Sequence, residues 1–490
     1  MQKKLSSLIC LLLLSSPLLA QTQSYDVVLT GGRVIDPETR LDAVRNVGIT
    51  NGKIARISAE PLQGQRTVSA KGLVIAPGFI DLHQHGQDIE SQRLKALDGV
   101  TSALELEIGV PDVAAFLNDM KGHSLINYGT AASHAAARAL AFGVPLPPET
   151  PNASSAPPVI IPKSGPATDR PATPQQIETM LTRLNCELHA GALAIGMGIQ
   201  YTPGATRHEV IDMFRLASEH HVPVYTHVRG AGELEPGSSI ESVSEVIAAS
   251  AITGAPLHIV HINSSCMKDA MECLAMVEGA RARGLDVTTE AYPYIAGMTY
   301  INSALFNPGF LEKFGIDYKD LVLPETGEHL TKARFEELHA SPKPQVVLIF
   351  NNTQAVIDKI IPHPLVMIAS DGEKNHPRNA GTFSRVLRQY VREQGTVTLM
   401  DAIRKMSLMP AQMLERSTPA ARYKGRLQEG ADADIVVFDP ATVTDRSTFQ
   451  HPKQPSEGMH YVLVGGKFVV EDGKVVPNLF PGQAIVGVGD

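Results

Sequence analysis

Short apolar runs alternate with segments of helical periodicity through the middle of the chain, and this alternation constrains the fold more than any other feature. Segments such as 207–221 and 266–284 carry apolar residues at the spacing of one helix face. The apolar runs lie at 101–107, 125–133, 192–199, 223–228, 256–263, 286–292, 345–350 and 365–371. Strand–helix alternation predicts a parallel sheet, and about eight strands over roughly 300 residues favour an α/β fold of the (β/α)8 TIM-barrel type. A doubly wound sheet is the alternative that periodicity leaves open.

The flanks of this middle region have a different rhythm. Val- and Ile-rich runs separated by Gly-Gly and Asn-Gly pairs follow Tyr25, and similar runs return at 431–440 and 460–476. Such spacing is typical of hairpins. We therefore expect a small β-sandwich domain built from residues 21–76 and 416–490, with the barrel at 77–415 between its two parts. Residues 145–174 contain ten prolines, a composition that predicts an extended surface insertion in the barrel.

The first twenty residues are interpreted separately. They combine Lys3 and Lys4 with an apolar stretch and end in Leu18-Leu19-Ala20. This pattern predicts a signal peptide that is cleaved near Ala20, and hence an exported protein that is periplasmic or secreted. The apolar stretch is shorter than the roughly 20 residues that a membrane span needs, so no stable membrane anchor is expected.

Composition excludes several classes of protein. A hydrophobic share of 43% is sufficient for a packed core, and a formal net charge of −8 argues against nucleic acid as a partner. Cleavage near Ala20 would leave Cys186, Cys266 and Cys273, an odd number without metal-type spacing, which predicts free thiols. The expected partner is a small molecule, and a homo-oligomer is among the states that the sequence leaves open.

Histidines and carboxylates mark the ends of several predicted strands. His83 and His85 follow an apolar run, and their spacing places both side chains on one side of a strand. Three other runs end at His227, His261 and Asp371. The carboxyl ends of barrel strands share one mouth, so these side chains are expected to meet there. Imidazoles and carboxylates are suitable ligands for a divalent transition metal.

One strand adds two carboxylates. Glu105 and Glu107 are two residues apart and therefore share a face of the run at 101–107. Glu107 lies nearer the end of the strand and is the favoured ligand, whereas Glu105 is the second choice. The alternative is that one or both of these glutamates form ion pairs inside the barrel mouth.

The order of these residues resembles that of the amidohydrolase superfamily of metal-dependent barrel hydrolases. Within it the chain is similar to the D-aminoacylase or N-acyl-D-amino-acid deacylase group, including N-acyl-D-glutamate deacylases. The resembling stretches are 99–101, 191–193, 201–204, 292–294, 370–372, 376–378 and 425–439. Together they extend over nearly all of the chain after residue 20.

The resemblance implies a divalent metal centre of one or two ions, with Zn²⁺ the expected metal. D-aminoacylases have a Cys ligand after the third strand, and this sequence has Glu107 there instead. A glutamate can bridge two cations, as it does in some relatives. The implied ligands are His83, His85 and Asp371 at one position, His227 and His261 at the other, and Glu107 between them.

The resemblance also implies substrate contacts. Tyr294 and Arg378 match residues that engage a substrate carboxylate, and a guanidinium suits bidentate carboxylate recognition. The deacylases carry a Lys two residues beyond the second metal histidine, where this sequence has Asn263. Arg229, two residues after His227, either compensates for the missing cation or forms an ion pair.

The expected chemistry is hydrolysis of a linear amide, the deacylation of an N-acyl-(D-)amino acid. A metal lowers the pKa of water toward neutrality, and Asp371 is expected to accept the proton and pass it to the leaving amine. Rivals within the superfamily are a cyclic-amide hydrolase of the dihydroorotase or hydantoinase kind and a dipeptidase. Such enzymes usually use a carboxylated lysine, and none lies at the end of 101–107. A catalytically dead barrel is a further alternative, which the complete ligand set disfavours.

Overall fold

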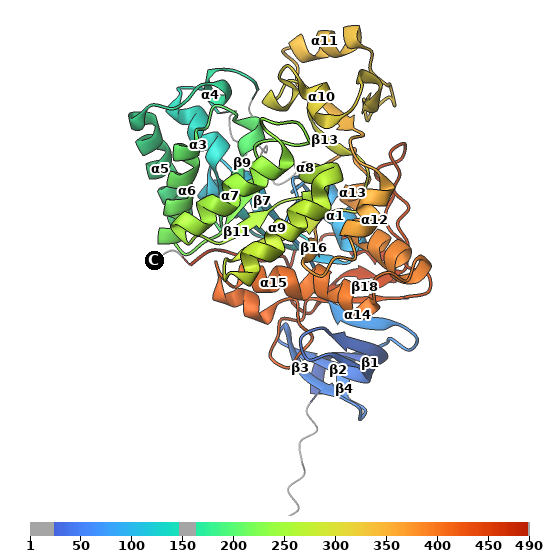
Figure 1. Ribbon diagram of the computed structural model, residues 1–490. Coiled ribbons are helices and arrows are strands. Elements are labelled where there is room, and N and C mark those ends of the chain that lie inside the picture. Colours follow the sequence, from blue (N-terminus) through green and yellow to red (C-terminus); the bar gives the residue numbers. More distant parts are fainter. Residues whose placement is uncertain (1–23, 147–162, 489–490) are drawn as a thin grey trace, which may run out of the picture.

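Eight parallel strands form the central sheet of the computed structural model, which describes residues 24–146 and 163–488 (Figure 1). The strands are β6 (Phe79–Asp81), β7 (Val100–Val110), β8 (Asn127–Ser133), β9 (Ile195–Gly198), β10 (Val224–His227), β11 (Leu257–Ile259), β12 (Val287–Ala291) and β16 (Val366–Ile368). Each pairs in parallel with its neighbours in this order, β16 lying beside β12. The expected α/β barrel is confirmed. The predicted signal peptide lies outside the described residues.

The first and last strands meet through the residues that follow them. Gln84, just after β6, forms a parallel bridge with Gly372, just after β16. The Gly372 carbonyl accepts hydrogen bonds from the His85 and Gly86 amides, at 2.9 and 3.1 Å. The barrel therefore closes at its carboxyl-terminal edge, where the predicted ligands lie.

Helices cover the outside of the barrel, as the helical periodicity predicts (Figure 1). Several begin at a side-chain cap, with Asp88, Thr173, Thr206 and Ser238 accepting from backbone amides of the first turn. The helices before β12 are α1 (Ile89–Leu97), α2 (Val113–Met120), α3 (His134–Ala141), α4 (Pro166–Asp169), α5 (Pro174–His189), α6 (Arg207–Glu219), α7 (Ser239–Thr253), α8 (Ile262–Cys266) and α9 (Ala270–Ala282). Those after β12 are α10 (Phe310–Phe314), α11 (Lys332–Ala340), α12 (Gln354–Ile360), α13 (Arg378–Arg385), α14 (Leu399–Ile403) and α15 (Met409–Leu414).

Both flanks of the barrel contribute to one nine-stranded sheet at one end of the molecule (Figure 1). Its strands are β1 (Ser24–Asp36), β2 (Leu41–Thr50), β3 (Lys53–Ser58), β4 (Gln63–Ser69), β5 (Val74–Pro77), β17 (Ile435–Phe438), β18 (Met459–Val464), β19 (Lys467–Glu471) and β20 (Lys474–Val475). The two flanks join where β5 pairs antiparallel with β17. Gly78 links this sheet to the barrel, and a Cβ there would lie 2.2 Å from the Thr101 hydroxyl, so no larger residue fits.

A small antiparallel sheet interrupts the barrel between β12 and β16. It contains β13 (Gly297–Tyr300), β14 (Leu321–Val322) and β15 (Val346–Ile349), and it lies with α10 and α11 at the end opposite the nine-stranded sheet (Figure 1). The expectation that the run 345–350 forms a barrel strand is wrong, because this run is β15. Val347 and Ile349 are buried in a separate apolar cluster that includes Phe310 and Phe335, and Leu348 is buried in a neighbouring cluster. A short apolar run has the same appearance in either environment.

A buried ion pair connects α3, the helix that follows β8, to α6, the helix that follows β9. Arg138 of α3 contacts both carboxylate oxygens of Glu209 in α6, and His134 Nε2 lies 2.9 Å from the same carboxylate. All three side chains are fully buried. Arg138 also donates to the Ala167 carbonyl, which holds the described end of the proline-rich segment against α3.

Other expectations fall partly outside the described residues. Residues 147–162 of the proline-rich insertion are not described, while its later part contains α4 and leads into α5. The three described cysteines are free thiols, with Cys186 exposed and Cys266 and Cys273 buried. Among the described helices, none combines the length and apolar character needed to cross a membrane.

Candidate metal centre

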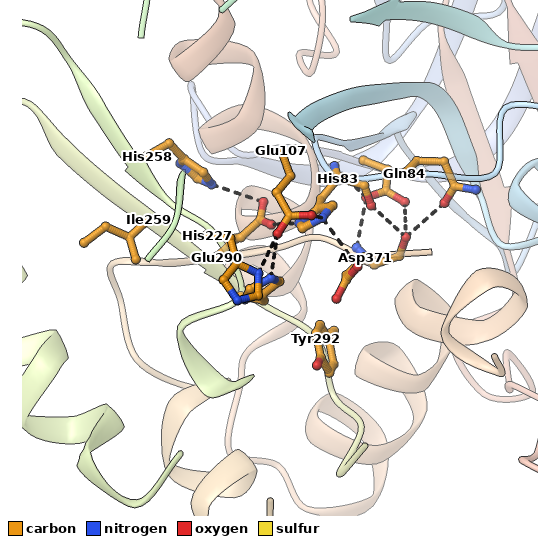
Figure 2. Close-up of polar contacts among 12 residues, drawn as sticks. His83, Gln84, Glu107, His227, His258, Ile259, Glu290, Tyr292 and Asp371 are labelled. Carbon is orange, nitrogen blue, oxygen red and sulfur yellow. Dashed lines mark hydrogen bonds and ion pairs between the residues drawn. The ribbon is translucent and has the colours of Figure 1, made fainter. Parts of the chain in front are cut away.

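Six side chains meet at the carboxyl-terminal ends of the barrel strands (Figure 2). They come from β7 and β10 and from the turns after β6, β11 and β16. They are His83, His85, Glu107, His227, His261 and Asp371. Their donor atoms form two groups that share Glu107, and within each group the atoms lie within 4.8 Å of one another, close enough to hold a metal ion. The structure thus brings together all six predicted ligands.

Glu107 lies between two pairs of histidines. Its Oε2 is 3.1 Å from His83 Nε2 and 3.2 Å from His85 Nε2. Its Oε1 is 2.9 Å from His227 Nδ1 and 3.0 Å from His261 Nε2. Because each oxygen faces a different pair, this carboxylate is placed to bridge two cations.

Asp371 completes the first group from the end of β16, the strand that closes the barrel beside β6. Its Oδ1 lies 3.4 Å from His83 Nε2 and 3.2 Å from His85 Nε2. Its Oδ2 points the other way, 2.8 Å from Arg378 Nη1. One carboxylate therefore connects the histidine pair to a guanidinium.

Further carboxylates hold the first two histidines from behind. Glu290 Oε1 lies 2.6 Å from His83 Nδ1, and Glu105 Oε2 lies 2.6 Å from His85 Nδ1. Both contacts leave Nε2 of the ring directed toward Glu107 and Asp371. Partners of this kind orient a metal-binding imidazole and increase its basicity. Glu105 thus has the ion-pair position that was the alternative for one of the two glutamates on β7.

Glu290 was missed by the sequence reasoning. It lies on β12 and is held in turn by His258, whose Nε2 is 3.1 Å from Glu290 Oε2 (Figure 2). His258 Nδ1 contacts the Thr288 hydroxyl at 2.8 Å, so the partners of both ring nitrogens lie outside the six-residue cluster. A lone glutamate in the otherwise uncharged strand 287–291 was the available signal.

The charges around the cluster favour a cation at its centre. Burial opposes protonation of His83, yet the carboxylates of Asp371, Glu107 and Glu290 raise its pKa to about 10. Burial also opposes protonation of His85, whose pKa is nevertheless raised by Glu105 and Asp371. These carboxylates attract positive charge to the space between the rings, and a divalent cation supplies that charge while leaving the imidazoles neutral. The donor set therefore fits a divalent metal.

Two of the predicted ligands adopt an uncommon backbone conformation. His261 has φ +29° and Asp371 has φ +51°, a region that residues other than glycine seldom occupy. His261 precedes α8, and its carbonyl accepts from the Ser264 and Ser265 amides. The fold holds both residues in this region at the site where their side chains meet, as is common at functional sites.

Comparison with known proteins identifies the family. The profile described as "Amidohydrolase family" matches residues 243–470. N-acyl-D-glutamate deacylase from Alcaligenes xylosoxydans xylosoxydans is 31% identical over 498 residues, covering 94% of this chain and 97% of the relative. The chain belongs to the amidohydrolase family. D-aminoacylase from the same organism is 29% identical over 482 residues, covering 91% of this amidohydrolase and 95% of the relative.

A solved structure agrees with this assignment. It is that of N-acyl-D-glutamate deacylase from Bordetella bronchiseptica, complexed with zinc and a phosphonate inhibitor that mimics the tetrahedral intermediate. It has a TM-score of 0.76 and 26% identity, and the match covers 95% of this amidohydrolase and 100% of the other chain. Fold and family together make this protein a hydrolase.

Arg378 and Tyr294, the two residues predicted to bind a substrate carboxylate, lie in different surroundings in this amidohydrolase. Arg378 is fully buried, lies 4.7 Å over the Tyr292 ring, and has no described hydrogen-bond partner at Nε or Nη2. Tyr294 lies apart from the cluster. Its hydroxyl is 3.4 Å from the Pro377 carbonyl, and its ring packs on Arg385.

Tyr292, and not Tyr294, is the tyrosine of this segment that faces the metal centre (Figure 2). Its ring centroid is 6.3 Å from that of His261. The sequence 292–294 places two tyrosines on either side of one proline, and the turn after β12 decides which of them faces the site. The expectation that Tyr294 binds substrate therefore has no support in this arrangement.

Two other residues near the ligands have structural contacts. Arg229 forms a bidentate ion pair with Glu245, at 2.8 and 2.6 Å, which is the second of its two predicted roles. Asn263 is buried, and its Oδ1 accepts from the Tyr292 amide at 3.3 Å. Neither residue adds a cation beside Arg378.

Proposed function

We propose that this amidohydrolase removes the acyl group from N-acyl-D-amino acids. The observation that carries the proposal is the position of Asp371 between the His83–His85 pair and the Arg378 guanidinium. In an N-acyl amino acid the scissile nitrogen and the carboxylate are attached to the same carbon. A substrate whose carboxylate reaches Arg378 would therefore bring its amide close to the metal ligands. The D configuration is proposed from the names of the two relatives.

We assign the metal positions to the six-residue cluster and propose zinc as the metal. His83, His85 and Asp371 would hold one ion, His227 and His261 the other, and Glu107 would contact both. Imidazole and carboxylate donors suit Zn²⁺. Bound there, a divalent metal polarises a carbonyl oxygen and lowers the pKa of water.

Asp371 is the proposed proton carrier. Its Oδ1 faces the histidine pair, where it can accept the proton of the attacking water and later donate it to the nitrogen of the leaving amine. Burial opposes ionisation, yet Arg378 and His83 hold the pKa of Asp371 well below its ordinary value. The carboxylate is thus ionised before the reaction and ready to act as a base. Substrate binding at Arg378 would weaken this ion pair and make the later donation easier.

A chelation and reloading experiment tests this function. The protein would be stripped of metal, reloaded with Zn²⁺, and assayed for amine release from N-acetyl-D- and N-acetyl-L-amino acids. Dihydroorotate, hydantoin and a dipeptide would represent the rival activities. We expect activity on the D-amino acid derivatives that is lost on chelation and restored by Zn²⁺. Failure of the reloaded protein to release amine from any N-acyl amino acid would refute the proposal.

We also propose that the protein is exported, on the basis of the pattern in residues 1–20. Expression of the full chain in a bacterium with a secretory pathway, followed by fractionation and mass spectrometry, tests this. A mature N-terminus near residue 21 in the periplasm or medium is expected, and an intact N-terminus in the cytoplasm would contradict it.

A further inference from the structure

The cavity in front of the metal centre has two unlike walls. One wall is formed by ligand side chains, among them His85, Glu107 and Asp371. The other is apolar and comes largely from the insertion between β12 and β16. Its residues are Met298 of β13, Leu305, Phe314 of α10 and Ile349 of β15.

The apolar wall is a built part of the fold. Leu305, Phe314 and Ile349 belong to the apolar cluster of the insertion, and they are 9%, 7% and 4% exposed. Met298 is 8% exposed and packs with Val322 and Leu348 in a neighbouring cluster. The wall is thus held by packing from behind, and its shape is set before a ligand arrives.

Among the described residues that line this cavity, the charged side chains outside the candidate metal cluster are acidic. None of the described residues that line it is a lysine or an arginine. Apart from the residues of the metal cluster, Glu373 is the one charged residue among those described that line the cavity. Arg378 is buried against Asp371, and Lys313, next to Phe314, lines the adjacent cavity with Glu312.

These features should make the cavity bind apolar substrate side chains in preference to acidic ones. An acidic side chain placed against the apolar wall would lose water without gaining a counter-charge, and such desolvation is costly. Glu373 offers it no positive charge in either protonation state. An apolar side chain would instead remove its own surface and that of the wall from water, which is favourable.

We propose that the insertion wall receives an uncharged, apolar side chain of the N-acyl amino acid, and that Glu373 is a specificity-determining residue that disfavours acidic side chains. This inference rests on the proposed deacylase function. It selects apolar amino acids, such as leucine and methionine, over glutamate and aspartate. The substrate α-carboxylate would use Arg378, which leaves no second cation for an acidic side chain.

Competing substrates test the inference on the zinc-loaded protein. We expect kcat/KM for N-acetyl-D-leucine and N-acetyl-D-methionine to exceed that for N-acetyl-D-glutamate and N-acetyl-D-aspartate by about tenfold or more. Equal or faster hydrolysis of the acidic substrates would overturn the inference while leaving the deacylase function intact. Hydrolysis of neither group would instead overturn the deacylase function, so the two failures are distinguishable.

Two variants examine the residues separately. Glu373→Gln should lower the ratio of kcat/KM for N-acetyl-D-leucine to kcat/KM for N-acetyl-D-glutamate at least about threefold. The change should come chiefly from a higher kcat/KM for N-acetyl-D-glutamate. Glu312→Gln, a matched change in the adjacent cavity, should leave the ratio within about twofold. An unchanged ratio in Glu373→Gln would contradict the role of this residue. Should that variant fold poorly, Leu305→Arg places a cation on the apolar wall and should also lower this ratio of kcat/KM values. An unchanged ratio in Leu305→Arg would contradict the wall as the site of the substrate side chain.

Discussion

Glu290 Oε1 lies 2.6 Å from His83 Nδ1, on the side of the imidazole that faces away from Glu107. His258 holds the other oxygen of Glu290 at 3.1 Å, and all three side chains are buried. Neither Glu290 nor His258 is among the six predicted ligands. Their arrangement nevertheless fixes the direction in which the His83 ring presents Nε2.

Replacing Glu290 should therefore weaken the metal centre without removing a ligand. We expect Glu290→Gln to lower zinc affinity or kcat/KM by about 10–100-fold, because the ring loses its charged partner. Chelator competition and steady-state kinetics measure the two effects. Glu278→Gln removes a mostly exposed glutamate 3.3 Å from His363 and should change neither. Unaltered zinc affinity and kinetics in Glu290→Gln would show that the contact does not tune His83.

The two glutamates of β7 should differ in their effect on metal content. Glu107→Ala removes the carboxylate that faces both histidine pairs, so we expect less than half of the wild-type zinc to remain bound and activity to be lost. Glu105→Ala removes only the partner of His85 Nδ1 and should retain the metal with weakened affinity. Elemental analysis after gel filtration distinguishes them. A Glu105 variant with the greater metal loss would reverse the assignment.

Asp371→Asn should lower the rate of the chemical step while leaving the protein folded. The amide cannot accept a proton as the carboxylate does, so we expect kcat to fall by about 10²–10⁴-fold. His227, His261 and Glu107 are unchanged and should keep their metal position. Asp286→Asn, which affects an Asp–Arg pair with Arg416 at 2.7 Å, is the control and should keep its kcat. A kcat within twofold of wild type in Asp371→Asn would exclude this residue as the proton carrier.

The buried contact between Glu209 and Arg138 should be important for stability. Glu209→Ala leaves the guanidinium buried without its carboxylate, which costs about 3–5 kcal/mol of unfolding free energy. Glu337→Ala removes a surface partner of Arg334 and should cost less than about 1 kcal/mol. Denaturant unfolding of the zinc-loaded proteins compares them. Similar losses in both variants would mean that burial does not strengthen this pair.

Lys405 should make the unfolding free energy depend on pH in the neutral to alkaline range. Burial, together with the charge of Arg404, lowers its pKa from 10.5 to about 7. The unfolded chain then binds more protons between these values, so the unfolding free energy rises with pH across this window, by up to about 1.4 kcal/mol per unit. Lys405→Met removes this contribution, and the advantage of the variant over wild type should shrink from pH 7 to 10. Lys332→Met, at an exposed position, should follow wild type at every pH, and parallel curves for Lys405→Met would contradict the assignment.

Much of the barrel and the six residues of the candidate metal centre could be predicted from the sequence, because both depend on local periodicity. The two-residue spacing of His83 and His85 sets their common direction, and the carboxyl ends of parallel strands share one edge. The run at 345–350 was assigned to the barrel because it is short and apolar, as the true barrel strands are. A short apolar run records that a segment is buried, but it does not record which sheet it joins.

Contacts between distant segments were decided only by the tertiary structure. Glu107 and Glu105 share one face of β7, and only the positions of four histidines from other strands assign them different roles. Tyr292 and Tyr294 are separated by one proline, and the turn after β12 directs only the first toward the cluster. The sequence determined which chemical groups reach the barrel mouth, since that follows from strand ends. Their pairing, and the apolar wall opposite them, depend on long-range packing that periodicity does not encode.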